Sequence, residues 1–377
     1  MAKPSGSPDV IKFSPEMPNQ QPGDRVPGQG AQRDNRRVRP SRPEDRPEIV
    51  ALMKDAGLTP DLDPGHLHWK YWQERLDWPG TRSFVFTDGE HILAHGAVMP
   101  GTLRWGTTQA RMIHMIDWAA RRDAVGAGIL LMKHIGTMTD FLIGVGGSEQ
   151  TLRIMPLMGY RHCGTVTGYV RTLSSWRLLS HSGGALWKRA PRMARSVLWA
   201  LSAPRALTDG WRARRIAIDE VAQVADVLAA SGLDRALPGR TPELIRHALG
   251  CPIVPVELHA LERAGRIGGY FLLSYTPGQA RLIDLRMASQ EPADWRALLH
   301  SAVREAGSRG GLAEIVAWSS DPHLSQVFES CGFHARLTLP IYLRSSGETL
   351  PPQETLQVQM LDNDAFYLDG SRKLLWV

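Results

Sequence analysis

The sequence has little cysteine and no long apolar run. Only three cysteines occur among 377 residues, at Cys163, Cys251 and Cys331, and none forms a CxxC pair. An odd, scattered set favours reduced, buried thiols in a cytosolic protein rather than disulfides. No stretch approaches the roughly 18 uninterrupted apolar residues of a membrane-spanning helix, and the N-terminus lacks the apolar core of a secretory signal. These absences predict a cytoplasmic protein.

Two kinds of catalytic centre are also missing. No grouping of His, Cys and Asp has the spacing of a metal site, so we expect no metal. The serines and cysteines show no nucleophile elbow. The chain is that of a soluble globular protein, with 43% hydrophobic residues and a length that allows two domains. Its net charge of +6 would suit an anionic ligand, nucleic acid or an anionic membrane surface.

The most informative stretch is 111–128, with the sequence RMIHMIDWAARRDAVGAG. A strand-like run passes through Asp117 and Trp118, and a turn containing Gly126 and Gly128 precedes an apolar helical run. Such a turn presents unpaired backbone N–H groups and the positive end of a helix dipole. This arrangement suits phosphate or pyrophosphate. The alternative is a tight strand-to-helix turn that binds nothing.

The segments that follow the turn extend the pattern. They read as a helix (128–138), a strand (140–145), a helix (149–158), the pair Gly159-Tyr160 and a strand (163–170). This order resembles the acyl-CoA-binding half of the GNAT acetyltransferase superfamily. The resemblance implies that acetyl-CoA or another acyl-CoA is the co-substrate. It also implies that the acceptor attacks the thioester where two parallel strands splay apart.

On this resemblance, one group of residues is expected to bind the acyl-CoA: Ile116, Trp118, Arg122, Val125, Gly126, Ala127 and Gly128. The family turn reads Gln/Arg-x-x-Gly-x-Gly/Ala, and here the basic residue lies one place early, as Arg122. Asp123 brings negative charge to a diphosphate site. It should weaken binding unless it points away or caps the helix N-terminus.

Acyl transfer requires a base for the acceptor, a donor to the oxyanion and, in some enzymes, an acid for the departing thiolate. Asp117 is the first candidate for the base, with a structural cap for the turn as the alternative. His114 could titrate near neutrality, although a lone strand histidine is commonly a core residue. Counting by twos places Asp117 on the face of Ile113 and Met115, opposite His114.

Two further assignments concern aromatic residues. The tyrosine that often acts as acid in the family corresponds to Met155 here, so Tyr160 is the substitute candidate, and a core aromatic is its alternative role. His68 and Tyr71, a helical turn apart, are candidates for contacts with the acceptor, with packing as the alternative.

The order of elements repeats after residue 214. We predict an α/β (α+β) fold of two tandem GNAT-like domains, each a mixed central sheet flanked by helices. The predicted parts are a disordered tail (1–36), an acyl-CoA-binding domain (37–175), a linker (176–213), a degenerate second domain (214–344) and a C-terminal tail with an edge strand (345–377). The second copy lacks the glycine turn and carries Glu291 and Asp294 there. It is therefore expected to be a scaffold or an acceptor-binding half.

The linker is basic and rich in tryptophan. Between Trp176 and Arg215 the chain has nine Lys or Arg and a single acid, Asp209. Such a segment could lie on an anionic membrane surface, at the inner membrane face, or could pack as a helical connector.

The Trp69-Lys70-Tyr71 element, the Asp88-Gly89 turn and Met99-Pro100 also resemble GNAT-like proteins found with bacterial polysaccharide genes. The two resemblances imply an acyltransferase for a small amine or sugar, such as an intermediate of envelope polysaccharide synthesis, and we expect no DNA partner. A FemABX-like transferase that uses aminoacyl-tRNA is one rival hypothesis, and the basic linker would suit RNA phosphates. A GNAT-like binding or scaffold protein without catalysis is the other. The missing tyrosine and the degenerate second copy favour that rival, whereas the glycine turn argues against the tRNA enzyme.

Overall fold

A computed structural model describes residues 35–58, 63–181, 191, 193–199, 210–229, 235–347, 351 and 356–367. Nearly all of the predicted N-terminal tail and most of the linker lie outside these residues. Within them, no helix is long and apolar enough to cross a membrane.

The first half of the chain alternates strands and helices in the predicted order. Its elements are β1 (Arg37–Pro40), α1 (Arg46–Asp55), α2 (Pro64–Leu67), β2 (Ser83–Thr87), β3 (Ile92–Trp105), β4 (Thr108–Ala120), α3 (Ala127–Gly136), β5 (Phe141–Val145), α4 (Glu149–Leu157), β6 (Arg161–Thr172) and α5 (Ser175–His181). A π-helical turn, His68–Trp72, continues α2. The sequence pattern predicts two strands here, 91–99 and 102–105, and the structure joins them as the single strand β3.

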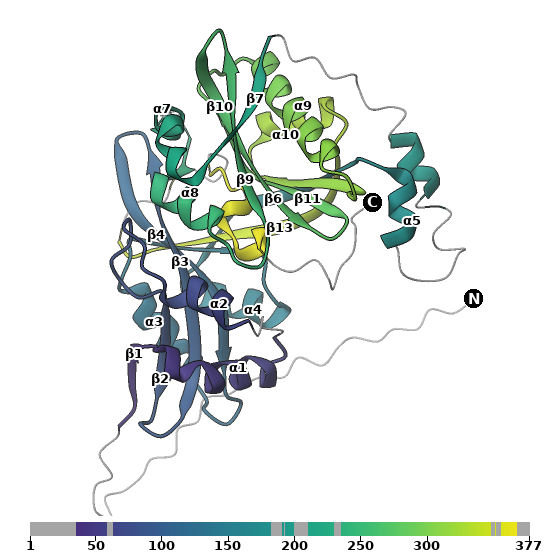
Figure 1. The fold of residues 1–377 in the computed structure, drawn as a ribbon. Coiled ribbons are helices and arrows are strands. Elements are labelled where there is room, and N and C mark those ends of the chain that lie inside the picture. Colours follow the sequence, from purple (N-terminus) through teal and green to yellow (C-terminus); the bar gives the residue numbers. More distant parts are fainter. Residues whose placement is uncertain are drawn as a thin grey trace, which may run out of the picture. The chain divides into compact units, whose positions relative to one another are not determined.

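The second half repeats this order. Its elements are β7 (Arg212–Ile216), α7 (Ala225–Ala229), β8 (Leu237–Pro238), α8 (Pro242–Leu249), β9 (Val256–Arg263), β10 (Arg266–Thr276), β11 (Gln279–Met287), α9 (Pro292–Ser308), β12 (Glu314–Ser319), α10 (Pro322–Ser330) and β13 (His334–Ser345). Short 3₁₀ turns occupy Pro43–Asp45, Ile218–Val224, Met360–Asp362 and Asp364–Phe366. In Figure 1, the purple to blue elements belong to the first half and the green elements to the second.

All described strands join one mixed sheet. Its main path runs β1-β2-β3-β4-β5-β13-β6-β12-β11-β10-β9-β7, and β8 pairs with β3 off this path. The order is a palindrome when each strand is exchanged for its counterpart in the other half. The last strand of each half lies beside the next-to-last strand of the other, since β13 pairs with β5 and β6 pairs with β12. The predicted mixed α/β fold is therefore confirmed, with both halves sharing one sheet.

Alternating side chains on β2 show how helices cover both faces of the first-half strands. Phe84 and Phe86 pack in a cluster with Leu131 and Ile135 of α3. Val85, between them, packs in another cluster with Ile49 of α1. Because successive strand residues point to opposite faces, α3 and α1 lie on opposite sides of the sheet.

Two local expectations were wrong. The first is a capping box predicted from Ser41 and Glu44, three residues apart: the Ser41 hydroxyl instead donates to Ser83 Oγ at 2.6 Å and accepts from Trp72 Nε1 at 3.0 Å. Asp45 instead accepts from the backbone N–H of Arg42 at 2.7 Å. The predicted edge strand at 356–361 is absent: Leu356 makes one isolated bridge, to Ala236. Buried side chains at Leu356, Val358, Met360 and Leu361 draw this segment into the core.

We call residues 356–367 the C-terminal strap. Its first part is held by side chains that replace strand pairing. The Ser320 hydroxyl donates to the carbonyl of Leu356 at 2.6 Å and accepts from the N–H of Val358 at 2.7 Å. Its end is held by the second half, where Ser274 Oγ donates to the carbonyl of Phe366 at 2.8 Å. The strap therefore has a fixed path across the molecule.

Candidate active site

The candidate site begins where β4 separates from β5. These parallel strands pair only over Met112–His114, although β4 continues to Ala120. Just beyond the pairing, β4 carries a bulge: Ala97 pairs with Ile116 and His95 with Ala119, so Asp117 and Trp118 face one residue of β3. Asp117 has a φ of 50°, in the left-handed region. A bulge re-aims the side chain at that point.

The bulge corrects the predicted face of Asp117. Its Oδ2 accepts a hydrogen bond from the hydroxyl of Tyr71 at 2.7 Å and forms an ion pair with Nζ of Lys70. Tyr71 belongs to the cluster that contains Leu67 of α2, on the side of α2. Strict alternation had put Asp117 with Ile113, which packs against α3. The extra residue of the bulge turns the carboxylate away from α3.

We call Lys70, Tyr71, Asp117 and Asp364 the polar centre. The Asp117 and Lys70 side chains are only 13% and 7% exposed. Burial works against the charged form of Asp117, but the charge of Lys70 and the hydrogen bonds from Lys70 and Tyr71 more than offset it and lower the pKa of this carboxyl. Asp117 is therefore held ionised.

Asp364, on the strap, responds in the opposite direction. Burial raises its pKa to about 6, with Lys70 lowering it and the negative charge of Asp117 raising it. The Lys70 ammonium also lies 5.2 Å from the centre of the Tyr367 ring. A pair of carboxyls whose environments push their pKa values apart is a common arrangement for acid–base chemistry.

His95 supports the bulge from β3. Its Nδ1 lies 3.1 Å from the backbone carbonyl oxygen of Asp117, and its Nε2 lies 2.9 Å from Ser83 Oγ. Burial lowers the pKa of His95 to about 4, so the ring is neutral at pH 7. A neutral ring whose Nδ1–H donates to the carbonyl fixes the backbone that carries the carboxylate.

The glycine turn has the geometry of an anion site. Gly126 has a φ of +84°, and an added Cβ would meet nothing within 4 Å. In the described part of the chain, the N–H groups of Val125, Gly126, Gly128 and Ile129 have no backbone partner. Asp123 makes two hydrogen bonds, at 3.0 and 3.1 Å, with the exposed Arg121. Its charge is thereby partly neutralised and faces solvent.

The predicted acyl-CoA residues divide into two groups. Arg122 and Val125 are exposed at the turn, and Val125 is 96% exposed. Ile116 and Ala127 are buried. Gly128 has a packing role, because an added Cβ would lie 3.1 Å from both Ala120 Cβ and Trp118 Nε1. Trp118 also donates to the carbonyl of Gly128 at 3.2 Å.

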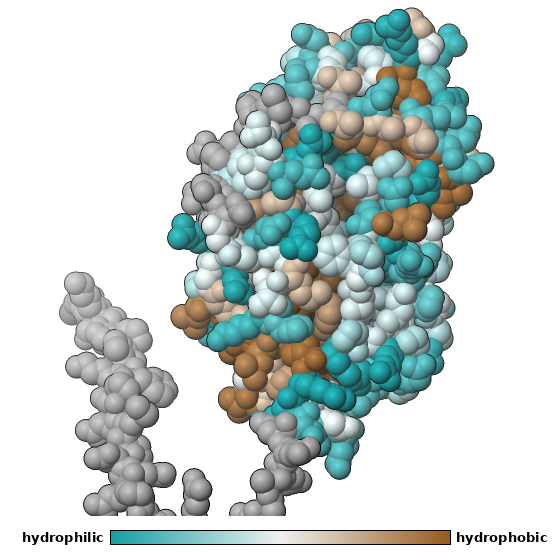
Figure 2. Space-filling view, turned by 90° about the vertical axis from the view of Figure 1, so that its left-hand side faces the viewer, coloured by the Kyte–Doolittle hydropathy of each residue, from teal (hydrophilic) through white to brown (hydrophobic). Residues whose placement is uncertain are grey.

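Figure 2 shows one face of the molecule, on which hydrophobic groups form patches between hydrophilic ones. At the start of α3 and its turn, three apolar side chains are exposed: Val125, Ile129 and Leu130. The anion-binding geometry of the turn thus adjoins an exposed apolar edge.

Three other predicted site residues, His68, His114 and Tyr160, do not join the polar centre. His68 is exposed, whereas Tyr71 is buried. His114 Nε2 lies 3.4 Å from the amide nitrogen of Asn363 on the strap. Tyr160 packs with Met155 in the apolar cluster beside α3, where burial raises the pKa of its phenol. No hydrogen bond in the described residues links His114 or Tyr160 to Asp117.

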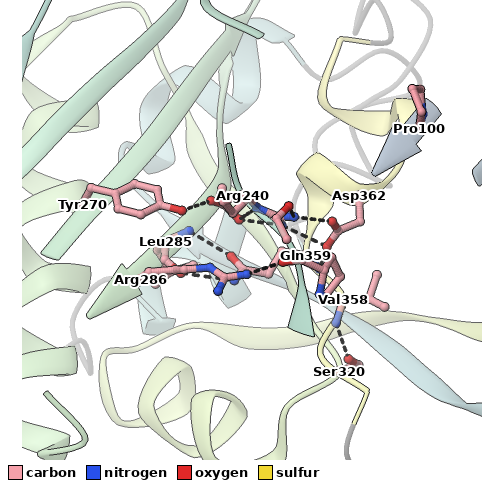
Figure 3. Close-up of polar contacts among 12 residues, drawn as sticks. Pro100, Arg240, Tyr270, Leu285, Arg286, Ser320, Val358, Gln359 and Asp362 are labelled. Carbon is pink, nitrogen blue, oxygen red and sulfur yellow. Dashed lines mark hydrogen bonds and ion pairs between the residues drawn. The ribbon is translucent and has the colours of Figure 1, made fainter. Parts of the chain in front are cut away.

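The second half contains a counterpart of this centre, shown in Figure 3. Asp284 follows a bulge in β11, at the register shift between Leu272 and Leu273 of β10. It accepts from Tyr270 at 2.6 Å and forms an ion pair with Arg240 at 2.8 Å. Arg240 also binds Asp362 of the strap at 2.6 Å. The counterpart is closed, since the side chains of both Arg240 and Asp284 are at most 1% exposed.

The backbone of β11 beyond this bulge is already occupied. Gln359 accepts from the N–H of Leu285 at 2.9 Å and donates to its carbonyl at 3.1 Å. Gln359 thus takes the place that another backbone-binding group would need at Leu285. The turn before α9 carries Glu291 and no glycine.

Sequence reasoning missed Lys70, His95, Tyr367 and Arg240, and it interpreted Asp362 and Asp364 only as a solvated turn or an acceptor contact. The Trp69-Lys70-Tyr71 element and the proximity of Asp362 to Asp364 in sequence were the available signals. In the described residues, no group of His, Cys, Asp and Glu has a metal-binding arrangement.

One cavity reaches the polar centre, and a second cavity shares a lining residue with the first. A narrow one of about 20 Å³ is lined by Lys70, Ile116, Tyr367 and others, and a larger one of about 570 Å³ is lined by Trp78, Pro100 and others. Leu244 lines both cavities. The larger, mainly apolar cavity thus adjoins the narrow one that reaches the polar centre.

Comparison with known proteins finds solved structures with a similar fold but no sequence relative. No family model and no curated protein matches the chain. A probable N-acyltransferase from Enterococcus faecalis V583, of unknown function, is 12% identical, with a TM-score of 0.56 over 82% of this chain and 72% of that chain. A GCN5-related N-acetyltransferase from Anabaena variabilis is 11% identical, with a TM-score of 0.55 and the same coverage.

Saccharomyces cerevisiae N-myristoyltransferase, solved with bound myristoyl-CoA, is also similar. It is 12% identical, with a TM-score of 0.58 over 84% of this chain and 80% of that chain. At these identities the likeness concerns the fold alone. The chain has a GNAT-like fold.

Proposed function

We propose that the protein is an acyl-CoA-dependent acyltransferase whose donor binds in the first half. The observation that carries the proposal is the separation of β4 from β5 between a glycine turn with unpaired N–H groups and a buried polar centre. The turn would bind the pyrophosphate through its N–H groups and the helix dipole. The thioester would then lie along the unpaired edge of β4, beside Asp117.

The donor is acetyl-CoA or a related acyl-CoA, and the acceptor is a small amine or sugar. The acceptor nitrogen or oxygen attacks the thioester carbonyl, the C–N or C–O bond forms, and the C–S bond breaks with the electron pair leaving on sulfur. The cavity of about 570 Å³ near Trp78 is the proposed approach for the acceptor. Envelope polysaccharide intermediates remain our candidate acceptors. A cytoplasmic location, with contact at the inner membrane face through 176–215, fits such a substrate.

Asp364 is the proposed general base. Its pKa of about 6 lies below neutral pH, so it is ionised there and still basic enough to take a proton. Asp117, whose pKa is lowered, is a weaker base. Its proposed role is to hold Lys70 and Tyr71 in place. His114 would support the strap through Asn363, and Tyr160 would serve as a core residue.

The two predicted domains, 37–175 and 214–344, take different parts in this proposal. The first would bind the donor, and the second would hold in place the strap that carries Asp364. This division rests on the contacts of the strap with Ser274 and Arg240 of the second half.

Calorimetric titration with acetyl-CoA and CoA is the first test, with Gly126→Glu as the control variant. Micromolar binding to the wild type that is lost in a folded Gly126→Glu protein is the expected result, because the added carboxylate repels the pyrophosphate. A thiol-release assay with a panel of amines and sugars then tests transfer. Absence of binding by the folded wild-type protein would refute the proposal.

A further inference from the structure

A second pocket lies where β11 separates from β12. These parallel strands pair only over Gln279–Leu282 of β11, which continues to Met287. Beyond the pairing, a cavity of about 200 Å³ opens between β11, the start of α9 and the start of α10. Leu237, Met287, Trp295 and Leu324 give it apolar walls, and Gln359 of the strap closes one side.

Arg286 is the unusual residue of this pocket. It is only 7% exposed. Its Nη2 donates to the carbonyl of Pro238 at 2.6 Å, whereas its buried Nε has no hydrogen-bond partner. Among the described residues, no carboxylate forms an ion pair with it. A buried guanidinium without a direct anionic partner is costly, because its charge has lost water and gained little in return.

The acids near Arg286 are already engaged. Asp284 and Asp362 both bind Arg240, at 2.8 and 2.6 Å. At the other side of the pocket, Asp321 binds Arg235 at 2.5 Å. Figure 3 shows Arg286 and Gln359 next to one another, with Arg240 bound to Asp362 nearby. The protein thus pairs the neighbouring cations and leaves Arg286 facing the cavity.

We propose that this pocket binds a small organic anion, whose carboxylate or phosphate group pairs with Arg286. The planar guanidinium suits both groups. The apolar body of the ligand would lie against Met287, Trp295 and Leu324. Gln290 and His323 line the same pocket and offer further polar contacts.

The site differs from the donor site of the proposed function and does not depend on it. A pyrophosphate-bearing cofactor does not fit here, because the adjoining turn has Glu291 and no glycine, and Gln359 occupies the backbone of Leu285. The volume suits a compact anion with a small hydrocarbon or aromatic body.

Binding is tested with the full chain, using benzoate and inorganic phosphate as probes and benzamide as the neutral analogue of benzoate. Trp295 lines the pocket, so its fluorescence and calorimetry provide two readouts. We expect at least one anion to bind, and benzamide to bind at least about tenfold more weakly than benzoate if the carboxylate is recognised. Binding of phosphate alone would identify a phosphate monoester as the ligand class, and binding of benzoate alone a carboxylate.

Arg286→Met should weaken binding of the anion at least about tenfold. Arg304→Met, which changes an exposed cation of α9 that does not line the pocket, is the matched control and should change binding less than about threefold. If Arg286→Met does not fold, Arg286→Lys and the comparison of benzoate with benzamide in the wild type still test whether the pocket recognises an anion through Arg286. The proposal is overturned if neither anion binds folded wild-type protein at about 20 mM, a concentration far above the dissociation constant of a specific site. It is also overturned if Arg286→Met binds the anion as tightly as the wild type does.

Discussion

Asp117 and Asp364 both interact electrostatically with Lys70, and their pKa values move in opposite directions. Asp117 comes from the bulge of β4 and Asp364 from the C-terminal strap. Lys70 favours the charged form of both, but it forms its ion pair with Asp117. This asymmetry makes one carboxylate a fixed anion and leaves the other able to exchange a proton near pH 6.

Asp117→Asn should lower the free energy of unfolding by about 3 to 5 kcal/mol, because it leaves Lys70 buried without its anionic partner. Urea denaturation measures the change. Asp123→Asn is the control, since Asp123 forms an exposed pair with Arg121, and this variant should unfold at nearly the wild-type urea concentration. Equal effects of both substitutions would contradict the assigned burial of the Lys70–Asp117 pair.

Under the proposed function, kcat/KM should fall about tenfold per pH unit below pH 6, because protonated Asp364 cannot accept the proton of the acceptor. Asp364→Asn should lower kcat by about 10²- to 10⁴-fold and remove this pH dependence. A pH–rate profile of both proteins is the measurement. If kcat/KM of the variant still falls below pH 6, a group other than Asp364 is responsible for the titration.

The stability of the same variant gives an independent check. The folded pKa of Asp364 is raised above its ordinary value of 3.8, so the folded state binds more protons between about pH 4 and pH 6. Ionisation of Asp364 therefore destabilises the fold as pH rises through this window. Asp364→Asn lacks this effect. The difference in free energy of unfolding between Asp364→Asn and the wild type should therefore be about 1 to 2 kcal/mol more favourable to the variant at pH 7 than at pH 4, a figure reduced for the partial exposure of the side chain.

Arg240→Met should be more damaging than Asp362→Asn. Removing Arg240 leaves both Asp284 and Asp362 without their cation, and Asp284 is fully buried. We expect a loss of about 3 to 5 kcal/mol for Arg240→Met. Asp362→Asn keeps the Arg240–Asp284 pair and should cost less. Urea denaturation of both variants tests this, because Arg240→Met should unfold at the lower urea concentration. The reverse order would contradict the role of Arg240 as the shared partner of Asp284 and Asp362.

His114→Asn should flatten the dependence of stability on pH. Burial lowers the pKa of His114 to about 4, below its ordinary value of 6.5. Between these values the unfolded state binds more protons, so the stability contributed by neutral His114 is complete above about pH 6.5 and is lost as pH falls toward 4. Thermal unfolding from pH 4 to 7 measures the slope. An unchanged slope in the variant would mean that His114 is not the residue responsible.

The sequence alone determined the kind and order of the elements. The mixed α/β class, the two similar halves, the glycine turn at Gly126 and the lack of such a turn before α9 follow from local patterns. Hydrophobic periodicity and glycine positions are properties of neighbouring residues. They are therefore legible before the chain is folded.

Only the tertiary structure decided which side chains meet. Strict alternation put Asp117 on the wrong face, because a bulge depends on the pairing of β4 with β3 and leaves little trace in one strand's sequence. The hydrophobic alternation at 356–361 predicted an edge strand, yet its apolar side chains entered the core. Lys70, Asp117, Asp364 and Arg240 come from distant parts of the chain. Their ion pairs exist because the shared sheet and the strap bring them together, which no local pattern specifies.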